Sequence, residues 1–542
     1  HHFSSFNNEP YLFSIKELRD NLMQRDGDVK ASRWCAGCHD VVPFMSGAFD
    51  DPDFDMENHP TAKAGITCTV CHAITHVNST KGNAAYTIEE PVHYPFAFSE
   101  NRALQYVNEL LVNAKPAFHN KTFLKPLHKT GEYCSACHKV SLPGELTHYK
   151  EWLRGQNHYD NFLLSGVSGS NARAFYFPPK AESNCNGCHM QLEQSTDFGA
   201  RFFDDSGKLK IHDHLYPSAN TALPHIRNAP DWVIEEHEQF HQGNLRVDIF
   251  GVKEGGTVDR PLTAPIRPEI PVLKPGQTYL FEIVIRTLKL GHIFTQGTAD
   301  SNQVWLDVKV EDDVGVLGQS GRVDEQKRVD PWSHFVNVYM LDKDGNRIDR
   351  RNAGDIFTPL YNNQIPPGAG SVVHYQFKVP EDQQEALKVS VRLNYRKFDT
   401  SYMQYVYGED YVNDLPVSVL AEDVVHFPVT GSKAPEADST AAIAPPAFPA
   451  WQRWNDYGIG LLLKGSAGSD KGELKQASEA FAQVESLGRP EGPVNAARVF
   501  FKEGRVDDAA RALQRAAGFT PPAPRWTMAW FTGRVHAQNG EL

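Results

Sequence analysis

All eight cysteines of this 542-residue chain fall into one repeated pattern, Cys-x-x-Cys-His, which begins at residues 35, 68, 134 and 185. In covalent attachment of c-type haem, two thiols form thioethers with the haem vinyl groups and the following histidine ligates the iron. The spacing suits this chemistry because the histidine lies about one helical turn after the first cysteine. The sequence therefore predicts four covalently bound haem c groups. The predicted attachment residues are Cys35, Cys38, Cys68, Cys71, Cys134, Cys137, Cys185 and Cys188, and the predicted proximal ligands are His39, His72, His138 and His189.

Other cysteine chemistry fits the pattern poorly. A disulfide framework would not place a histidine after every second cysteine, a zinc ribbon needs two cysteine pairs per metal, and a thioredoxin-like site uses one pair. Because haem is attached outside the cytoplasm, we expect a periplasmic or extracellular protein. The chain starts at His1 without Met or a signal peptide, so we expect a processed start.

The sixth iron ligand decides whether a haem carries electrons or offers an open iron. Only four of the seven methionines lie near the motifs, whereas histidine is abundant there, so two histidines per iron is the predicted ligation. Each candidate for a distal ligand is also open to a role as an ordinary loop or hydrogen-bonding histidine. The candidates are His2, His59, His128, His158, His214 and His292.

Four haems in so short a stretch must form much of the interior of their own domain. We expect residues 1–235 to be mostly short helices and irregular loops that hold the haems near contact, the arrangement that electron hopping requires. Helices are predicted over residues 15–23 and 104–112, packing on haem faces. An amphipathic helix is predicted over residues 149–158, ending at His158.

The character of the sequence changes after residue 245. Runs of β-branched and aromatic residues, separated by Asp-Gly and Pro-Gly turn signals, predict an antiparallel, Ig-like β-sandwich over residues 245–430. The predicted strands are 279–285, 304–310, 335–341, 372–379 and 389–395. We find no Ser-His-Asp order, phosphate loop or HExxH motif in this region.

Residues 431–450 are rich in Pro, Ala and Ser and are predicted to be a linker. Beyond it, helical segments open at Gly472, Gly504 and Gly540, with intervals that bracket the 34-residue tetratricopeptide (TPR) period. Residues 451–542 are therefore predicted to be TPR-like helical repeats that bind a protein partner and that continue past residue 542.

Composition excludes several classes of protein. A content of 40% hydrophobic and 11% aromatic residues argues against disorder, and no apolar run approaches the length of a spanning helix. The net charge of −13 argues against a nucleic-acid partner.

The motifs with their flanking residues, such as Gly65-Ile-Thr-Cys68 and Cys188-His189-Met190, resemble the multihaem c-type cytochromes of the cytochrome c-554-like group, particularly members with a tetratricopeptide tail. Gly291-His292-Ile-Phe-Thr-Gln-Gly297 partly resembles a segment of sandwich domains in multihaem cytochromes. The resemblance implies an electron shuttle, a subunit of a respiratory complex or a filament-forming cytochrome. The Cys-x-x-Cys-Lys haem of related nitrite reductases is absent from the sequence.

Together these features predict a multidomain tetrahaem cytochrome that carries electrons between redox protein partners. Two alternatives stay open: a subunit of an extracellular cytochrome filament that assembles with copies of itself, and a multihaem reductase or oxidase with one open iron.

Overall fold

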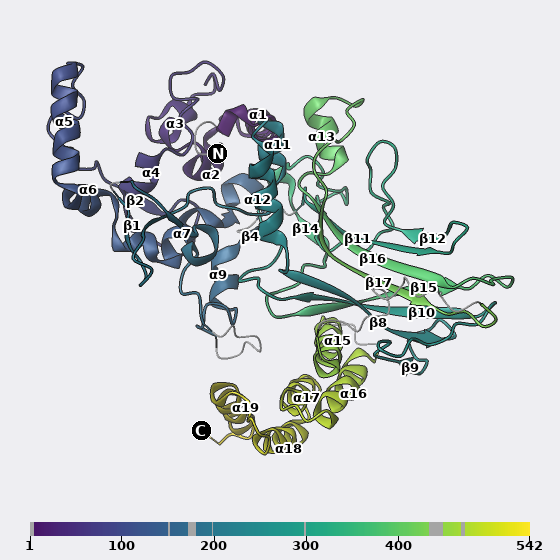
Figure 1. Ribbon diagram of the computed structural model, residues 1–542. Helices are drawn as coiled ribbons and strands as arrows, with labels where there is room; N and C mark the ends of the chain where they lie inside the picture. The colour runs from purple at the N-terminus through teal and green to yellow at the C-terminus, as the bar shows by residue number, and fades with distance from the viewer. Residues whose placement is uncertain are drawn as a thin grey trace.

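The computed structural model describes residues 5–149, 152–171, 180–197, 199–297, 300–432, 448–467 and 472–541. Figure 1 shows three parts in chain order: a domain of short helices with small sheets, a pair of larger sheets, and an array of helices beneath them. No helix in these residues is long and apolar enough to cross a membrane.

The N-terminal domain is built of short elements. Its helices are α1 (Glu9–Asp26), α2 (Arg33–His39), α3 (Val41–Met45), α4 (Cys68–Ala73), α5 (Arg102–Ala114), α6 (Pro116–Phe123), α7 (Gly131–His138), α8 (Gly144–Thr147), α9 (His158–Leu163), α10 (Asn186–His189), α11 (Ala222–Ile226) and α12 (Asp231–His241). Its strands are β1 (Ile74–Val77), β2 (Tyr86–Ile88), β3 (Lys139–Leu142), β4 (Trp152–Asn157), β5 (Leu192–Gln194), β6 (Arg201–Phe202) and β7 (Leu209–His212). They form three small antiparallel sheets, β1-β2, β3-β4 and β5-β7-β6.

Two of the predicted helices lie within observed ones, and a third prediction is wrong. Residues 15–23 fall in α1 and residues 104–112 in α5, although no side chain of α5 is buried and the helix projects from the domain (Figure 1). The predicted helix over 149–158 is replaced by β4, and a helix only begins at His158. Pairing with β3 overrides the local amphipathic pattern, because a short segment takes its conformation from its neighbours.

Two four-stranded antiparallel sheets follow, in the orders β15-β10-β8-β9 and β12-β11-β16-β17. The strands are β8 (Leu245–Glu254), β9 (Leu262–Thr263), β10 (Thr278–Thr287), β11 (Gln303–Glu311), β12 (Val316–Ser320), β15 (Gly370–Lys378), β16 (Leu387–Arg396) and β17 (Ser418–Phe427). A separate hairpin pairs β13 (Val338–Leu341) with β14 (Thr358–Asn362), and helix α13 (Thr400–Tyr407) follows β16.

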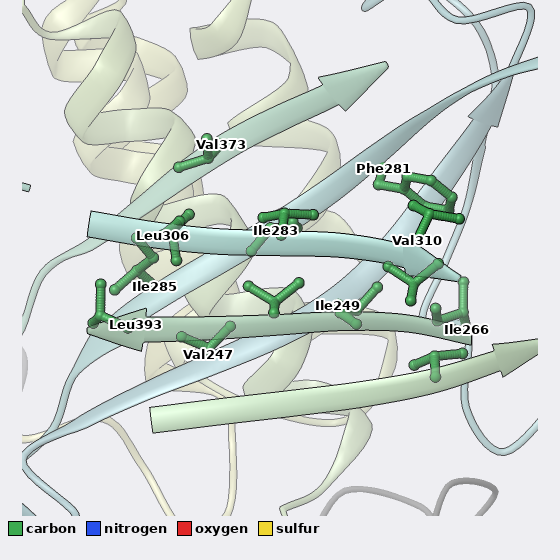
Figure 2. Close-up of a cluster of buried hydrophobic side chains, with 14 of the residues drawn as sticks. Val247, Ile249, Ile266, Phe281, Ile283, Ile285, Leu306, Val310, Val373 and Leu393 are labelled. Atoms are coloured by element: carbon green, nitrogen blue, oxygen red, sulfur yellow. The ribbon is translucent and has the colours of Figure 1, made fainter. Parts of the chain in front are cut away.

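The two sheets share one apolar core. Ile249 and Ile283 from the first sheet pack with Leu306 and Leu393 from the second, as Figure 2 shows, and all four side chains are completely buried. Four predicted strands coincide with β10, β11, β15 and β16. The prediction for residues 335–341 holds only in β13, which lies outside both sheets.

The C-terminal helices pack against the first sheet through α15. They are α15 (Ala450–Gly465), α16 (Glu473–Ser486), α17 (Glu491–Lys502), α18 (Val506–Ala517) and α19 (Arg525–Gln538). Phe250 and Val372 on the outer face of the first sheet share a buried cluster with Tyr457 and Leu461 of α15. Most of the predicted linker lies outside the described residues, and α15 already begins at its last residue, Ala450.

Candidate haem-binding sites

Each of the four Cys-x-x-Cys-His motifs ends a short helix: α2, α4, α7 and α10. Local capping sets two of these helices, because Thr67 accepts a hydrogen bond from Val70 N at 3.2 Å and Thr130 accepts one from Tyr133 N at 3.3 Å. The helices place each pair of thiols and the following imidazole on neighbouring turns, as the attachment chemistry requires.

The cysteine side chains bring the motifs together. All eight are free thiols. The thiol of Cys137 is hydrogen-bonded to Cys38, and that of Cys134 to Cys185, and in both cases this contact is the main reason why the pKa of the α7 thiol is raised. Helix α7 therefore lies between the first and the fourth motif. The second motif also reaches it, since the Tyr133 hydroxyl donates to Cys71 O at 2.9 Å.

The ring nitrogens of two proximal histidines are oriented by main-chain carbonyls. His72 Nδ1 lies 2.6 Å from Phe123 O, and His189 Nδ1 lies 3.0 Å from Pro217 O. A carbonyl can only accept, so each Nδ1 must carry the proton, which leaves the lone pair of Nε2 free for a metal. Such carbonyl contacts are the usual partners of ligating histidines.

Three distal candidates have the same arrangement. The Nδ1 atoms of His158, His214 and His292 lie 3.1, 2.9 and 3.2 Å from the carbonyls of His138, His212 and Ile293. Their Nε2 atoms are therefore also available to bind a metal.

Two pairs of imidazoles stand at the spacing that a shared iron requires. Metal–imidazole bonds are about 2 Å long, so two rings on opposite sides of one iron have their centroids roughly 6 Å apart. His189 and His292 are 6.1 Å apart with nearly parallel rings, at 9°. His72 and His214 are 6.5 Å apart at 35°.

His292 reaches the fourth motif from the β-sandwich. It lies in the segment after β10, which packs against α9: a Cβ added at Gly291 would stand 3.2 Å from the ring of Phe162. The main-chain N–H of Asn157 donates to Gln296 Oε1 of the same segment at 3.1 Å. The two domains therefore build this imidazole pair together.

Three other pairs of imidazoles have their ring centroids too close together for an iron to lie between them in this structure. His138 lies 5.2 Å from His158, and His158 lies 4.7 Å from His292. His128 lies 5.0 Å from His72, with both of its ring nitrogens buried and without a hydrogen-bond partner in the described residues. A buried imidazole with neither nitrogen satisfied is costly unless it binds a group.

Burial favours the neutral imidazole, the form that ligates metal. It lowers the pKa of His39 to about 3 and those of His138, His128 and His292 to about 4.

The first motif is built differently. Tyr11 of α1 stacks on His39 with ring centroids 4.8 Å apart and donates its hydroxyl to Asp40. The candidate His59 stands beside Phe54, which shares a buried cluster with Tyr11 and Ala36 at the first motif, and its Nδ1 lies 2.8 Å from Thr61 Oγ1. The candidate His2 lies outside the described residues.

Two further histidines, His237 and His241, are buried one helical turn apart on α12. They are not among the distal ligands predicted from the sequence. His237 Nδ1 lies 2.9 Å from Ser218 O, and His241 lies between the rings of Phe294 and Tyr395. The His-x-x-x-His spacing was the available signal, since it puts both imidazoles on one helix face.

The chain's own residues thus fit haem c. Within the described residues there is no group of three or more His, Cys, Asp or Glu side chains that could hold a metal ion by themselves. Imidazoles in pairs, beside paired thiols, are what a porphyrin-bound iron needs, because the macrocycle supplies the other four ligands.

Comparison with known proteins adds little. No family model and no curated protein matches the chain. Among solved structures, it is similar to a penta-haem cytochrome c552 from Thermochromatium tepidum, with a TM-score of 0.42 and 16% identity over 72% of this chain and 83% of the other. At that level of likeness, the function has to be argued from the residues of this chain.

Proposed function

We propose that the chain is an electron-transfer protein that holds four covalently attached haem c groups outside the cytoplasm, most of them ligated by two histidines. Each haem, when bound, exchanges one electron at its iron. The observation that carries the proposal is the pairing of His189 with His292 and of His72 with His214 at the spacing of a shared iron, next to paired thiols.

The chain's residues perform three tasks in this function. The cysteines fix each haem at two points, so that it stays in place through repeated oxidation and reduction. Nδ1–carbonyl contacts hold the imidazoles in the tautomer that presents Nε2 to the metal. The fold brings the attachment points of three motifs together around α7, which favours short steps between neighbouring haems.

The alternative function, a reductase or oxidase, would require one iron with an open coordination position.

A haem count combined with electron paramagnetic resonance tests both functions. The protein is produced with haem-attachment machinery, its haem is measured as the pyridine haemochrome, and the oxidised protein is recorded at low temperature. Four haems with only low-spin signals support the electron carrier. One stoichiometric high-spin haem supports the enzyme, and a chain without covalent haem refutes both.

An electron carrier needs redox protein partners, and we propose that it either exchanges electrons with such partners or assembles with copies of itself into filaments. The C-terminal helices, as TPR-like repeats, are the proposed partner surface. Size-exclusion chromatography with light scattering, over a range of concentrations, separates a monomeric carrier from a self-assembling one.

A further inference from the structure

The β-sandwich approaches the first motif through α13. The buried Tyr402 of α13 donates its hydroxyl to Pro10 O of α1 at 2.5 Å, and Ser14 Oγ lies 2.8 Å from the Tyr402 hydroxyl. The next residue of α1, Tyr11, stacks on His39. One turn of α1 thus joins the segment around α13 to the first predicted proximal ligand.

We call the contact between α13 and this turn of α1 the junction. Two cations, Arg351 and Lys397, lie beside it. Each stands 5.4 Å from the centroid of the same ring, Phe398. Arg351 also donates from Nη1 to the Tyr402 hydroxyl at 3.2 Å, while its Nε is buried without a hydrogen-bond partner in the described residues.

Neither cation has a carboxylate within ion-pair distance among the residues that the structure describes, although nearby arginines do. Arg347 pairs with Asp399 at 2.6 Å, and Arg350 pairs with Glu17 at 3.7 Å. Cations removed from water are normally paired, because their desolvation is otherwise uncompensated.

Both the backbone conformation of Arg351 and Phe398 and the pKa of Lys397 are unusual. Arg351 and Phe398 have φ angles of 62° and 68°, a left-handed conformation that is unfavourable for an L-residue with a side chain. Burial, followed by the charge of Arg351, lowers the pKa of Lys397 to about 7, although the charge of Asp300 acts in the opposite direction. The charge of Arg351 also lowers the pKa of His39, after the larger effect of burial, so this arginine lies within electrostatic reach of the first motif.

We propose that Arg351 and Lys397 bind a propionate carboxylate of the haem attached at Cys35 and Cys38. A porphyrin fixed to these thiols and ligated by His39 would supply carboxylates of its own, the kind of anion that would pair with Arg351 and Lys397. This inference rests on the proposed function, because it requires haem at the first motif.

The consequence is electrostatic. Reduction adds one electron to the haem, taken from an external one-electron donor, and converts Fe(III) to Fe(II). Because the reduced haem carries one positive charge fewer, adjacent cations favour it. Arg351 and Lys397 therefore raise the reduction potential of the first haem, so that the β-sandwich tunes a haem of the other domain.

The test is a potentiometric titration of the full-length holoprotein followed by optical absorption. Arg351→Gln and Lys397→Gln should each lower one of the four transitions by about tenfold in its equilibrium constant, which is about 59 mV for one electron. Arg351→Lys should keep the potential because it keeps the charge. The matched control is Arg350→Gln, which removes a neighbouring but exposed charge and should move no transition.

The transition that moves is assigned with His39→Met, which changes the axial ligand of the first haem and should shift the same transition. The proposal is overturned if no transition moves in Arg351→Gln, if all four move together, or if Arg350→Gln has the same effect.

A free anion is the other possible source of the carboxylate. If titration with sodium acetate shifts the potential of the wild-type protein but not that of Arg351→Gln, the junction binds a dissolved anion and the propionate assignment is wrong. A pyridine haemochrome assay of each variant keeps these outcomes separate from failure of the proposed function, which would appear as absence of covalent haem.

Discussion

At the scale of single residues, the hydrogen-bond partner of each imidazole matters as much as its position. His72, His189, His214 and His292 all place Nδ1 against a main-chain carbonyl. Because the carbonyl fixes the tautomer, each ring is prepared to ligate through Nε2 before any metal arrives. The same contacts limit rotation of the rings and so would help to hold the ligand geometry constant in the proposed electron transfer.

His292→Ala should remove the second ligand of the fourth haem, because its ring stands 6.1 Å from that of His189. One of the four haems should change from low spin to high spin, which electron paramagnetic resonance measures. His225→Ala is the control, since His225 instead faces Asp414 at 3.4 Å. Four unchanged low-spin haems in His292→Ala would show that another side chain ligates the fourth iron.

The buried His241 should make folding sensitive to acid. Burial lowers its pKa to about 4 in the folded protein, against an ordinary value of 6.5. Between these values only the unfolded chain binds the proton, so stability falls as pH falls from about 6.5 towards 4. Relative to His241→Leu, the wild type should lose about 2 kcal/mol of unfolding free energy between pH 7 and pH 5.

Urea unfolding of the holoprotein at the two pH values, followed by circular dichroism, measures this difference. His93→Gln serves as the control, because His93 lies in the same domain with a partly exposed side chain. Equal losses of stability in the wild type and in His241→Leu would mean that His241 is already protonated in the folded protein at pH 5.

At the scale of elements, the docking of α15 on the first sheet depends on close approach. A Cβ at Gly460 would lie 2.8 Å from Val372 Cγ2 and 3.1 Å from the main chain of Ser371 and Val372. A Cβ at Gly458 would lie 2.5 Å from the ring of Phe481. Glycine in the middle of a helix costs stability, so these positions are explained by packing rather than by helix formation.

Gly460→Ala should therefore destabilise the protein by about 1–3 kcal/mol, the usual cost of overpacking. Gly533→Ala is the matched control, because Gly533 is also helical, in α19, and a Cβ there meets nothing within 4 Å. That variant should be neutral or slightly stabilising, through its better helix propensity. Thermal unfolding of the two variants measures the contrast, and equal midpoints would contradict close docking.

Element by element, the sequence pattern was informative where apolar residues dominate a strand, as in β10, and uninformative where charged residues interrupt the apolar run, as in β8. Strands β10, β11, β15 and β16 were foreseen. Strand β8 was not, because its charged residues looked exposed: Asp248 and Lys253 are buried in ion pairs with Arg453 and Glu282. Those pairs exist only once distant segments have come together.

At the scale of the whole molecule, the three parts are joined by buried contacts. Arg453 of α15 is 1% exposed and donates to both carboxylate oxygens of Asp248 at 2.8 Å. Tyr402 joins the β-sandwich to α1, and His292 joins it to the fourth motif. The β-sandwich, for which the sequence suggested no chemical role, is thus the part on which the other two are held.

Arg453→Ala should separate the helical array from the sheets. The substitution leaves Asp248 with Arg267 as its ion-pair partner. Removal of one member of a buried ion pair lowers the free energy of unfolding by roughly 3–5 kcal/mol. We expect faster amide hydrogen exchange throughout α15. Arg392→Ala, which breaks an ion pair with both side chains 58% exposed, should have little effect. Unchanged exchange in Arg453→Ala would show that apolar contacts alone hold the helices.

The sequence by itself is enough to predict the attachment residues and the proximal ligands, because the chemistry of Cys-x-x-Cys-His depends on spacing within one helical turn and needs no tertiary context. Only the tertiary structure decided which other histidines stand opposite them, since His189 and His292 come from different domains. The same holds for the cations beside the first motif. An ion or a metal is bound by groups that are close in space, and for residues in separate elements that closeness arises only from folding.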